Sequence, residues 1–318
     1  MSRATPIRVG ISSCLLGSAV RYDGGHKRDR FLTDVLGPFV QFVPVCPEVE
    51  VGMGVPRESV RLVESEGELR LLAERSGTDH TRAMRAWARR RIRQLAALDL
   101  CGYVLKKDSP SCGMERVRVH AGTGVPERRG RGLFAGALLD AWAHLPVEEE
   151  GRLHDPVLRE SFIERLFAYR RLRDLFAGRW NVGDLLRFHT AHKLQLMAHS
   201  PKANGELGRL VARAKRVPRA ELRDLYETGF MQALAVRATP RRHVNALLHM
   251  LGHFGTRLDA AARREILGVI EDYRRGLVPL IVPLTVVRHH VRLRGVAYLE
   301  GQHYLEPHPK ELMLRNHV

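Results

Sequence analysis

The sequence predicts an α/β amino-terminal domain with a Rossmann-like open, mostly parallel sheet, followed by a mainly α-helical carboxyl-terminal domain. Up to about Leu145, short apolar runs that end in Gly, Ser or Pro alternate with longer segments of helical period. After about Pro146, β-branched runs nearly vanish and amphipathic segments follow one another. We therefore expect two domains, over residues 1–146 and 147–318.

The first domain is expected to contain at least three strands and one long helix. The strands are Arg8–Ser13, Phe39–Val45 and Gly102–Leu105, each followed by turn-forming residues. The helix covers Asp79–Leu98, where apolar residues recur at helical spacing. Four arginines share another face of that helix: Arg82, Arg85, Arg89 and Arg93. This basic face is either an ordinary solvated surface or a contact for RNA.

The second domain is expected to be a set of amphipathic helices separated by Gly and Pro. The expected helices cover Phe162–Phe176, Val182–Met197, Asn204–Ala214, Pro218–Leu234, Arg241–Gly252 and Asp259–Arg275.

Composition narrows the possible functions. The 318 residues are 44% hydrophobic, which excludes intrinsic disorder, and Lys and Arg outnumber Asp and Glu by 52 to 35. Both halves are basic, with 23 basic and 16 acidic residues up to 145 and 29 and 19 beyond it. The net charge of +17 makes nucleic acid the expected partner, although charge alone says nothing about fold. No protein partner is evident, and the oligomeric state is not predicted.

Cysteine usage and the apolar runs bear on location. Four cysteines are too few to cross-link a chain of this length, which indicates a reducing compartment. The longest apolar run, Leu277–Val287, is too short to span a membrane and contains two prolines. We expect a cytoplasmic protein with no membrane contact.

Three cysteines share one context. Cys14, Cys46 and Cys112 each follow a strand-like run and stand beside turn formers, so three loops at the carboxyl ends of strands could bring three thiols together. The site would suit zinc with an open position or a 4Fe-4S cluster with one iron not held by cysteine. Buried thiols without metal are the alternative. Cys101, at the start of a strand, is interpreted as structural.

Four elements in order resemble the thiouracil desulfidase family: Gly10–Gly17, Arg21–Gly25, Cys46-Pro47-Glu48, and Lys106 with Ser109–Gly113. Two further segments, Phe188–Pro201 and Tyr304–Val318, are similar to the YbgA-like helical domain. The combination resembles the RudS-type desulfidases, which remove sulfur from 4-thiouridine in transfer RNA. The resemblance implies a 4Fe-4S cluster held by Cys14, Cys46 and Cys112, whose fourth, open iron captures the substrate's sulfur.

The resemblance also implies catalytic roles for a glutamate and a serine, which are Glu48 and Ser109 here. Glu48 could act as general base for the attacking water, and Ser109 could donate a hydrogen bond or proton to the ring. The alternatives are a surface or capping carboxylate for Glu48 and a local Ser-Pro turn for Ser109.

Other residues beside the cysteine loops are expected to bind substrate, namely Arg21, Asp23, Lys106 and Ser111. Arg21 and Asp23 could instead pair with each other. Asp108 could cap the loop before Ser109 and is assigned no chemistry.

RNA contacts are expected from the basic helix of the first domain and from the helical domain, in particular Arg85, Arg89, Arg93, Lys193 and Lys202. Further basic candidates in the second domain are Arg170, Arg171, Arg173, Arg209, Arg213, Lys215, Arg216, Arg219, Arg241 and Arg242. His189 and His192 lie one helical turn apart, yet no third ligand shares their face, so packing, hydrogen bonding or RNA contact is favoured over metal binding.

The function expected from these observations is hydrolytic, non-redox desulfuration of 4-thiouridine in transfer RNA, which yields uridine and hydrogen sulfide. Three alternatives remain: a desulfidase for free thiouracil or 4-thiouridine monophosphate, an iron-sulfur RNA-binding sensor without turnover, and a zinc-dependent hydrolase of another substrate. A general base beside the cluster would distinguish an enzyme from a sensor.

Overall fold

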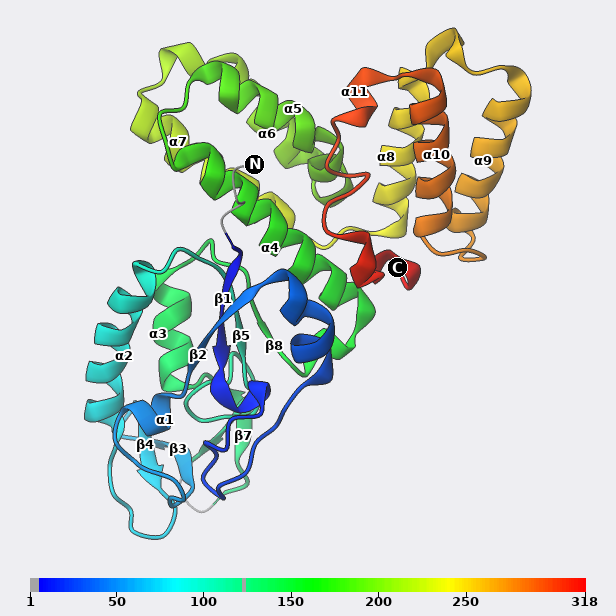
Figure 1. Ribbon diagram of the computed structural model, residues 1–318. Helices are drawn as coiled ribbons and strands as arrows, with labels where there is room; N and C mark the ends of the chain where they lie inside the picture. Colours follow the sequence, from blue (N-terminus) through cyan, green and yellow to red (C-terminus); the bar gives the residue numbers. More distant parts are fainter. Residues whose placement is uncertain (1–5, 122–123) are drawn as a thin grey trace. The chain divides into compact units, whose positions relative to one another are not determined.

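The computed structural model describes residues 6–121 and 124–318. The chain forms two compact units, one ending at His154 and the other starting at Asp155. Figure 1 shows an α/β unit and a helical unit, which confirms the predicted fold class. The boundary lies later than residue 146, because Val147–Glu149 forms strand β8 and pairs with the sheet of the first unit.

The main sheet of the first unit is parallel throughout. Its strands are β1 (Arg8–Ser12), β2 (Gln41–Val45), β5 (Leu100–Leu105) and β8, and their order is β2-β1-β5-β8. Every residue of β5 is buried, as expected for a central strand of a covered parallel sheet. The expected strands are therefore confirmed in kind, with ends that differ by a few residues.

Glycine at position 10 allows β1 and β5 to pack closely. A Cβ atom there would lie 2.2 Å from the ring of Tyr103 on β5. Tyr103 then packs edge-on against Phe134, whose ring centroid is 5.9 Å away. Within residues 6–121 and 124–154, the α-helices are α1 (Pro47–Glu50), α2 (Thr81–Ala96) and α3 (Leu133–Ala141).

A second sheet was not expected. Its order is β4-β3-β6-β7, formed by β3 (Val60–Ser65), β4 (Glu68–Ala73), β6 (Val117–His120) and β7 (Glu127–Gly130). The β3–β4 hairpin turns at Glu66 and Gly67, both with positive φ. A two-residue turn of this kind normally carries Asn or Asp at its first position, so Glu66 gave no turn signal.

The second unit is helical. Its helices are α4 (Pro156–Phe176), α5 (Val182–His199), α6 (Pro201–Ala212), α7 (Arg219–Ala235), α8 (Pro240–His253), α9 (Ala260–Arg274), α10 (Ile281–Arg294) and α11 (Ala297–Glu300). Asp155 caps α4 by accepting hydrogen bonds from the backbone N–H groups of Val157 and Leu158, both at 2.9 Å. Across the described part of the chain, no helix has both the length and the apolar character of a membrane span.

Helix α10 was missed by the sequence analysis because it begins inside the apolar run that contains two prolines. Pro279 precedes the helix, and Pro283 lies in its first turn, where no intrahelical N–H bond is lost. The helix ends at Gly295, whose φ of 58° is the left-handed conformation that favours glycine.

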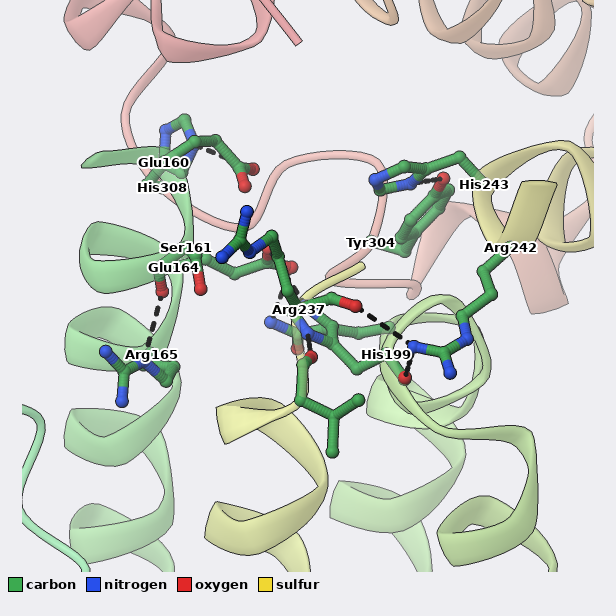
Figure 2. A network of polar contacts seen from close by, with 12 residues as sticks. Glu160, Ser161, Glu164, Arg165, His199, Arg237, Arg242, His243, Tyr304 and His308 are labelled. Atoms are coloured by element: carbon green, nitrogen blue, oxygen red, sulfur yellow. Dashed lines mark hydrogen bonds and ion pairs between the residues drawn. The ribbon is translucent and has the colours of Figure 1, made fainter. Parts of the chain in front are cut away.

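The helical unit buries a network of ionisable side chains (Figure 2). Glu164 accepts a hydrogen bond from Gln195 at 2.9 Å and pairs with His199 at 3.2 Å, and all three are buried. Arg315, near the end of the chain, donates to Glu160 at 3.0 Å. These residues belong to the segments that resemble the YbgA-like domain or contact them, so those segments are held by buried charge pairs.

The network sets opposite pKa shifts on one pair. Burial alone would raise the pKa of Glu164, but His199 together with Arg315 and His243 outweighs burial, and the pKa is lowered. Burial alone would lower the pKa of His199, and Glu164 raises it instead. The pair is therefore charged inside the helical unit near neutral pH.

Several basic residues expected to contact RNA lie in this interior instead. Arg170 is buried and pairs with Asp174. Arg171 donates to His192 at 3.1 Å and to the Pro307 carbonyl at 2.9 Å. Arg242 is half-buried and donates to the carbonyls of His199 and Arg237. Because these guanidinium groups hold the fold, they are corrected from RNA contacts to structural residues.

The two histidines one turn apart are also structural. His189 Nδ1 lies 3.1 Å from the Tyr226 hydroxyl, and His192 Nδ1 lies 2.8 Å from the Phe188 carbonyl oxygen. Both rings are buried. Packing and hydrogen bonding, the favoured interpretation, is what the structure has at these positions.

The buried histidine of α8 leads to a prediction about pH. His243 Nδ1 lies 2.7 Å from the Tyr304 hydroxyl (Figure 2), and burial together with Arg315 lowers the pKa of His243 to about 4. In the unfolded chain, the His243 side chain takes up a proton near pH 6.5, whereas in the folded chain it stays neutral at this pH. The contribution of this group to stability is thus complete above pH 6.5 and is lost as the pH falls toward 4.

When the pH falls from 7 to 5, the unfolding free energy of the wild type should decrease because of this histidine. We predict that the decrease is about 2 kcal/mol smaller in His243→Gln. Chemical denaturation of the full chain at both pH values measures this difference. His249→Gln, which changes an exposed histidine of the same helix, should keep the wild-type pH dependence. Equal pH dependence in all three proteins would contradict the prediction.

Candidate active site

The three cysteines singled out above follow three neighbouring strands. Strands β2, β1 and β5 are adjacent and parallel, and they end at Val45, Ser12 and Leu105. Their carboxyl ends therefore meet at one edge of the sheet. Because β2 and β5 flank β1 on opposite sides, this edge is the switch point at which open α/β sheets bind ligands.

The first two cysteines lie directly at strand ends. Cys14 is in a short 3-10 helix, Ser13–Leu16, which ends at Gly17 with a φ of 93°. Cys46 precedes α1, and its backbone N–H donates to the Glu50 carboxylate at 3.2 Å. The Cys46 sulfur lies 3.8 Å from the Val20 carbonyl oxygen, which brings the two loops together.

The Cys112 loop is held by hydrogen bonds and by close packing. Ser109 Oγ accepts from the backbone N–H groups of Ser111 at 3.2 Å and Cys112 at 3.0 Å. The first N–H groups of α3 donate to the carbonyls of Pro110 and Ser111. A Cβ atom at Gly132 would lie 2.5 Å from the Ser111 carbonyl, so only glycine permits this approach.

One cavity of about 500 Å³ joins these loops. Cys14, Cys46 and Cys112 all line it. It is also lined by four other residues expected at the site: Arg21, Glu48, Lys106 and Ser109. Sites of small ligands commonly have this size.

Asp23 and Ser111, both expected to bind substrate, do not line the cavity. Asp23 is exposed, lies 3.4 Å from Arg21 Nε and accepts a hydrogen bond from the Gly25 N–H at 3.0 Å. The pairing of Arg21 with Asp23, left open above, is thus present. Ser111 is fully buried, and its hydroxyl has no hydrogen-bond partner among the described residues.

The three thiols influence one another electrostatically. Burial raises the pKa of Cys14 to about 11, and Cys46 raises it further while Lys106 opposes it. Burial likewise raises the pKa of Cys46, and it raises that of Cys112 strongly, with additions from Cys14 and Cys46. Three thiolates in this cavity are therefore unfavourable unless a strongly cationic group binds them.

A metal cluster fits this donor set. In the described part of the chain, no three His, Cys, Asp or Glu side chains converge on the position of a single ion. In an iron-sulfur cluster each cysteine binds its own iron, so ligands on three separate loops around a cavity are suitable. Ser12 also hydrogen-bonds Cys112 and favours its thiolate.

Glu48 is held by an arginine that the sequence analysis did not identify. Arg57 Nε lies 3.2 Å from Glu48 Oε2, and Nη2 contacts the same oxygen. The other nitrogen of the guanidinium group donates to the carbonyls of Val20 at 2.9 Å and Gly54 at 3.0 Å. The Arg57 side chain is 5% exposed and the Glu48 side chain 15%, so the carboxylate is fixed at the cavity wall.

Glu48 is therefore not a helix cap. The carboxylate that accepts the first N–H of this turn belongs to Glu50, which also pairs with Arg91 at 3.0 Å. The capping alternative applies to Glu50. The Glu48 carboxylate is held by Arg57 and lines the cavity instead.

Ser109 has the local turn role that was considered for it and also lines the cavity. Its oxygen shapes the Cys112 loop by accepting two N–H groups, while its residue lines the cavity. Since a hydroxyl can accept two hydrogen bonds and donate one, its O–H remains able to donate.

Lys106 is anchored by neighbouring groups. Its backbone N–H donates to Ser12 Oγ at 3.0 Å, and its ammonium pairs with Glu150 and donates to the Lys107 carbonyl at 3.1 Å. Asp108 pairs with Arg128 at 3.0 Å rather than capping the loop.

Three other cations line the cavity without an acidic partner among the described residues, namely Lys27, Lys107 and Arg118. Three carboxylates line the same cavity: those of Glu48 and Asp108 are already paired, and that of Glu74 accepts a hydrogen bond from Ser59 and offsets one of the three cations. The cavity thus presents uncompensated positive charge. No motif marked these residues in the sequence, because each is an ordinary basic residue in a loop or strand.

Cys101 is separate from this site. It is fully buried in β5, and its sulfur lies 3.8 Å from the Asp99 carbonyl oxygen. It does not line the cavity, in agreement with its interpretation as structural.

The chain is similar to known proteins in both units. Residues 9–150 match the family described as 2-thiouracil desulfurase, and residues 193–309 match a family described as a protein of unknown function (DUF1722). The uncharacterized protein YbgA of Escherichia coli (strain K12) is 34% identical over 161 residues, which are 49% of this chain and 94% of YbgA.

Two further proteins are similar to part of the chain. The uncharacterized protein YbbK of Bacillus subtilis (strain 168) is 30% identical over 108 residues, 32% of this chain and 71% of YbbK. The solved structure of the [4Fe-4S]-dependent thiouracil desulfidase TudS is 31% identical, with a TM-score of 0.41, over 49% of this chain and 98% of TudS.

The 2-thiouracil desulfurase match covers the loops of all three cavity cysteines, and the DUF1722 match falls outside them. Residues 9–150 thus match the family of 2-thiouracil desulfurases, enzymes that remove sulfur, and the chain belongs to the same family as YbgA.

Proposed function

We propose that this enzyme hydrolyses 4-thiouridine in transfer RNA to uridine and hydrogen sulfide, with a 4Fe-4S cluster held by Cys14, Cys46 and Cys112. The observation that carries the proposal is the meeting of three thiols from adjacent strand ends with an oriented carboxylate, Glu48, in one cavity. A sensor without turnover has no need of such a carboxylate.

The reaction balances without an electron donor. Water adds its oxygen to the ring carbon, the carbon–sulfur bond breaks, and the two protons of the water leave with the sulfur as hydrogen sulfide. When bound, the cluster supplies an iron with a free position, a soft Lewis acid suited to sulfur. The remaining steps depend on side chains of the chain itself.

Glu48 is the residue suited to take the proton from water. It lines the cavity, and Arg57 binds one of its oxygens, which leaves the other able to accept. Ser109, on the opposite loop, has an O–H able to donate to the ring of the substrate. The two residues would act as base and hydrogen-bond donor.

The charge of the cavity favours a nucleotide over a free base. Among the described residues, Lys27, Lys107 and Arg118 have no acidic partner, so they can bind a phosphate of the substrate. A neutral thiouracil ring would leave these charges uncompensated. 4-Thiouridine monophosphate is therefore a second candidate substrate, and the basic helical unit favours the transfer RNA.

We predict that anaerobically reconstituted protein converts 4-thiouridine in transfer RNA to uridine, followed by absorbance near 330 nm and by nucleoside analysis. Cys112→Ala should abolish the reaction because it removes a cluster ligand. Cys101→Ala, at a buried cysteine outside the cavity, is the matched control and should remain active.

Other outcomes have defined meanings. If 4-thiouridine monophosphate is consumed while the transfer RNA stays thiolated, the substrate is the free nucleotide. If neither substrate reacts but the protein still binds RNA, the protein is an RNA-binding sensor and the proposed desulfidase function is wrong. Equal loss in Cys101→Ala and Cys112→Ala would contradict the ligand assignment.

The Arg57–Glu48 pair leads to a separate prediction. Glu48→Gln should lower kcat by about 100-fold or more, as for loss of a general base. Arg57→Lys should lower kcat by about tenfold, because one ammonium cannot hold both the carboxylate and the Val20 and Gly54 carbonyls.

If Arg57 acts through Glu48, the double variant should be no slower than Glu48→Gln alone. Steady-state kinetics on the same substrate tests this. Losses in kcat that multiply in the double variant would show that Arg57 acts independently of Glu48.

A further inference from the structure

A second cavity of the first unit lies outside the cysteine site. It has a volume of about 430 Å³ and lies between the edge strand β4 and the amino-terminal half of α2. Its charged lining consists of Arg70, Arg82, Arg85 and Arg89 together with Glu68 and Asp79. We name it the α2 groove. Four guanidinium groups against two carboxylates give it a positive charge.

The pairing of these groups leaves part of that charge free. Arg85 donates to the Leu69 carbonyl at 3.1 Å and lies 4.0 Å from Glu68. The Asp79 carboxylate already accepts the Thr81 N–H at 2.8 Å. Arg82 and Arg89 are exposed and have no partner within the described residues.

Helix α2 carries this charge at a cost to its own stability. It contains six arginines and no acidic residue in 16 positions. Like charges three or four residues apart repel one another, and Arg82 lies in the first turn, where the helix dipole disfavours a cation. Arg91 is half-buried and pairs with Glu50, but packing does not explain the exposed arginines, because the core face is formed by Met84, Trp87 and other apolar residues. An external anion would compensate this repulsion.

The geometry favours a phosphodiester backbone as that anion. The exposed arginines of α2 run from Arg82 to Arg93, a length of about 16 Å at 1.5 Å per residue. Over that length, one strand of a duplex carries about five phosphates. A guanidinium group can donate two parallel hydrogen bonds to two oxygens of one phosphate. A membrane surface is disfavoured, because the other exposed residues of the helix are small or polar, among them Ala83, Ala86 and Gln94.

The groove and the cysteine cavity border the same hairpin. Arg70 on β4 lines the groove, and Glu74, just beyond the end of β4, lines the cysteine cavity. Four residues of extended chain cover about 13 Å. An RNA strand with one base in the cysteine cavity could therefore place neighbouring phosphates in the groove.

We infer that the α2 groove binds the phosphate backbone of the RNA substrate beside the modified nucleotide. This inference rests on the proposed function. According to this inference, the catalytic unit itself contacts the RNA through Arg82 and Arg89. The helical unit is then a second RNA contact.

The test compares two neighbouring residues in the full chain. Arg89→Ala and Arg90→Ala remove the same charge from the same helix, and both residues are exposed, but only Arg89 lines the groove. Arg89→Ala should raise the Kd for 4-thiouridine-containing transfer RNA about fivefold and reduce the salt dependence of binding by about one ion. Arg90→Ala should have the wild-type Kd and salt dependence.

A second measurement separates this inference from the proposed function. In Arg82→Ala/Arg89→Ala, kcat/KM on transfer RNA relative to 4-thiouridine monophosphate should fall at least tenfold. Equal effects of Arg89→Ala and Arg90→Ala, or no effect of either, would overturn the groove as an RNA site. If no thiolated substrate reacts at all, the proposed function fails, while the binding comparison still decides the groove.

Discussion

The parallel alignment of β2, β1 and β5 is the constraint on which the rest of the site depends. Parallel neighbours end at the same edge, so three loops far apart in sequence reach one cavity. Gly10 permits the tight contact of β1 with Tyr103 on β5, because a Cβ atom at this position would overlap the ring. If β1 were displaced, the cysteine loops would lose their common position.

Around these strands, several side chains of the site hold the cysteine loops in place by contacts within the protein. Arg57 connects Glu48 to the loop that follows Cys14, and Ser109 folds the Cys112 loop around its own oxygen. Gly132 lets α3 approach that loop closely. The lining cations without acidic partners are then the groups free to bind an anionic substrate.

Much of this could be predicted from the sequence. Strand ends followed by Cys14, Cys46 and Cys112 indicated a shared site, and all three cysteines line one cavity. Arg57 could not be predicted, because its role depends on a loop that folds back over Val20. The second sheet was missed because Glu66 occupies a turn position that normally signals itself by Asn or Asp. Burial of Arg170, Arg171 and Arg242 was equally invisible, since helical periodicity does not show which charges are paired inside.

The most direct measurement is the iron bound per chain after anaerobic reconstitution, compared between the wild type and single Cys→Ser variants at the four cysteines. The account predicts about four irons for the wild type and for Cys101→Ser, whose site is buried in β5 away from the cavity. It predicts a large loss for Cys14→Ser, Cys46→Ser and Cys112→Ser. Retention of iron by these three variants, or equal loss by Cys101→Ser, would contradict it.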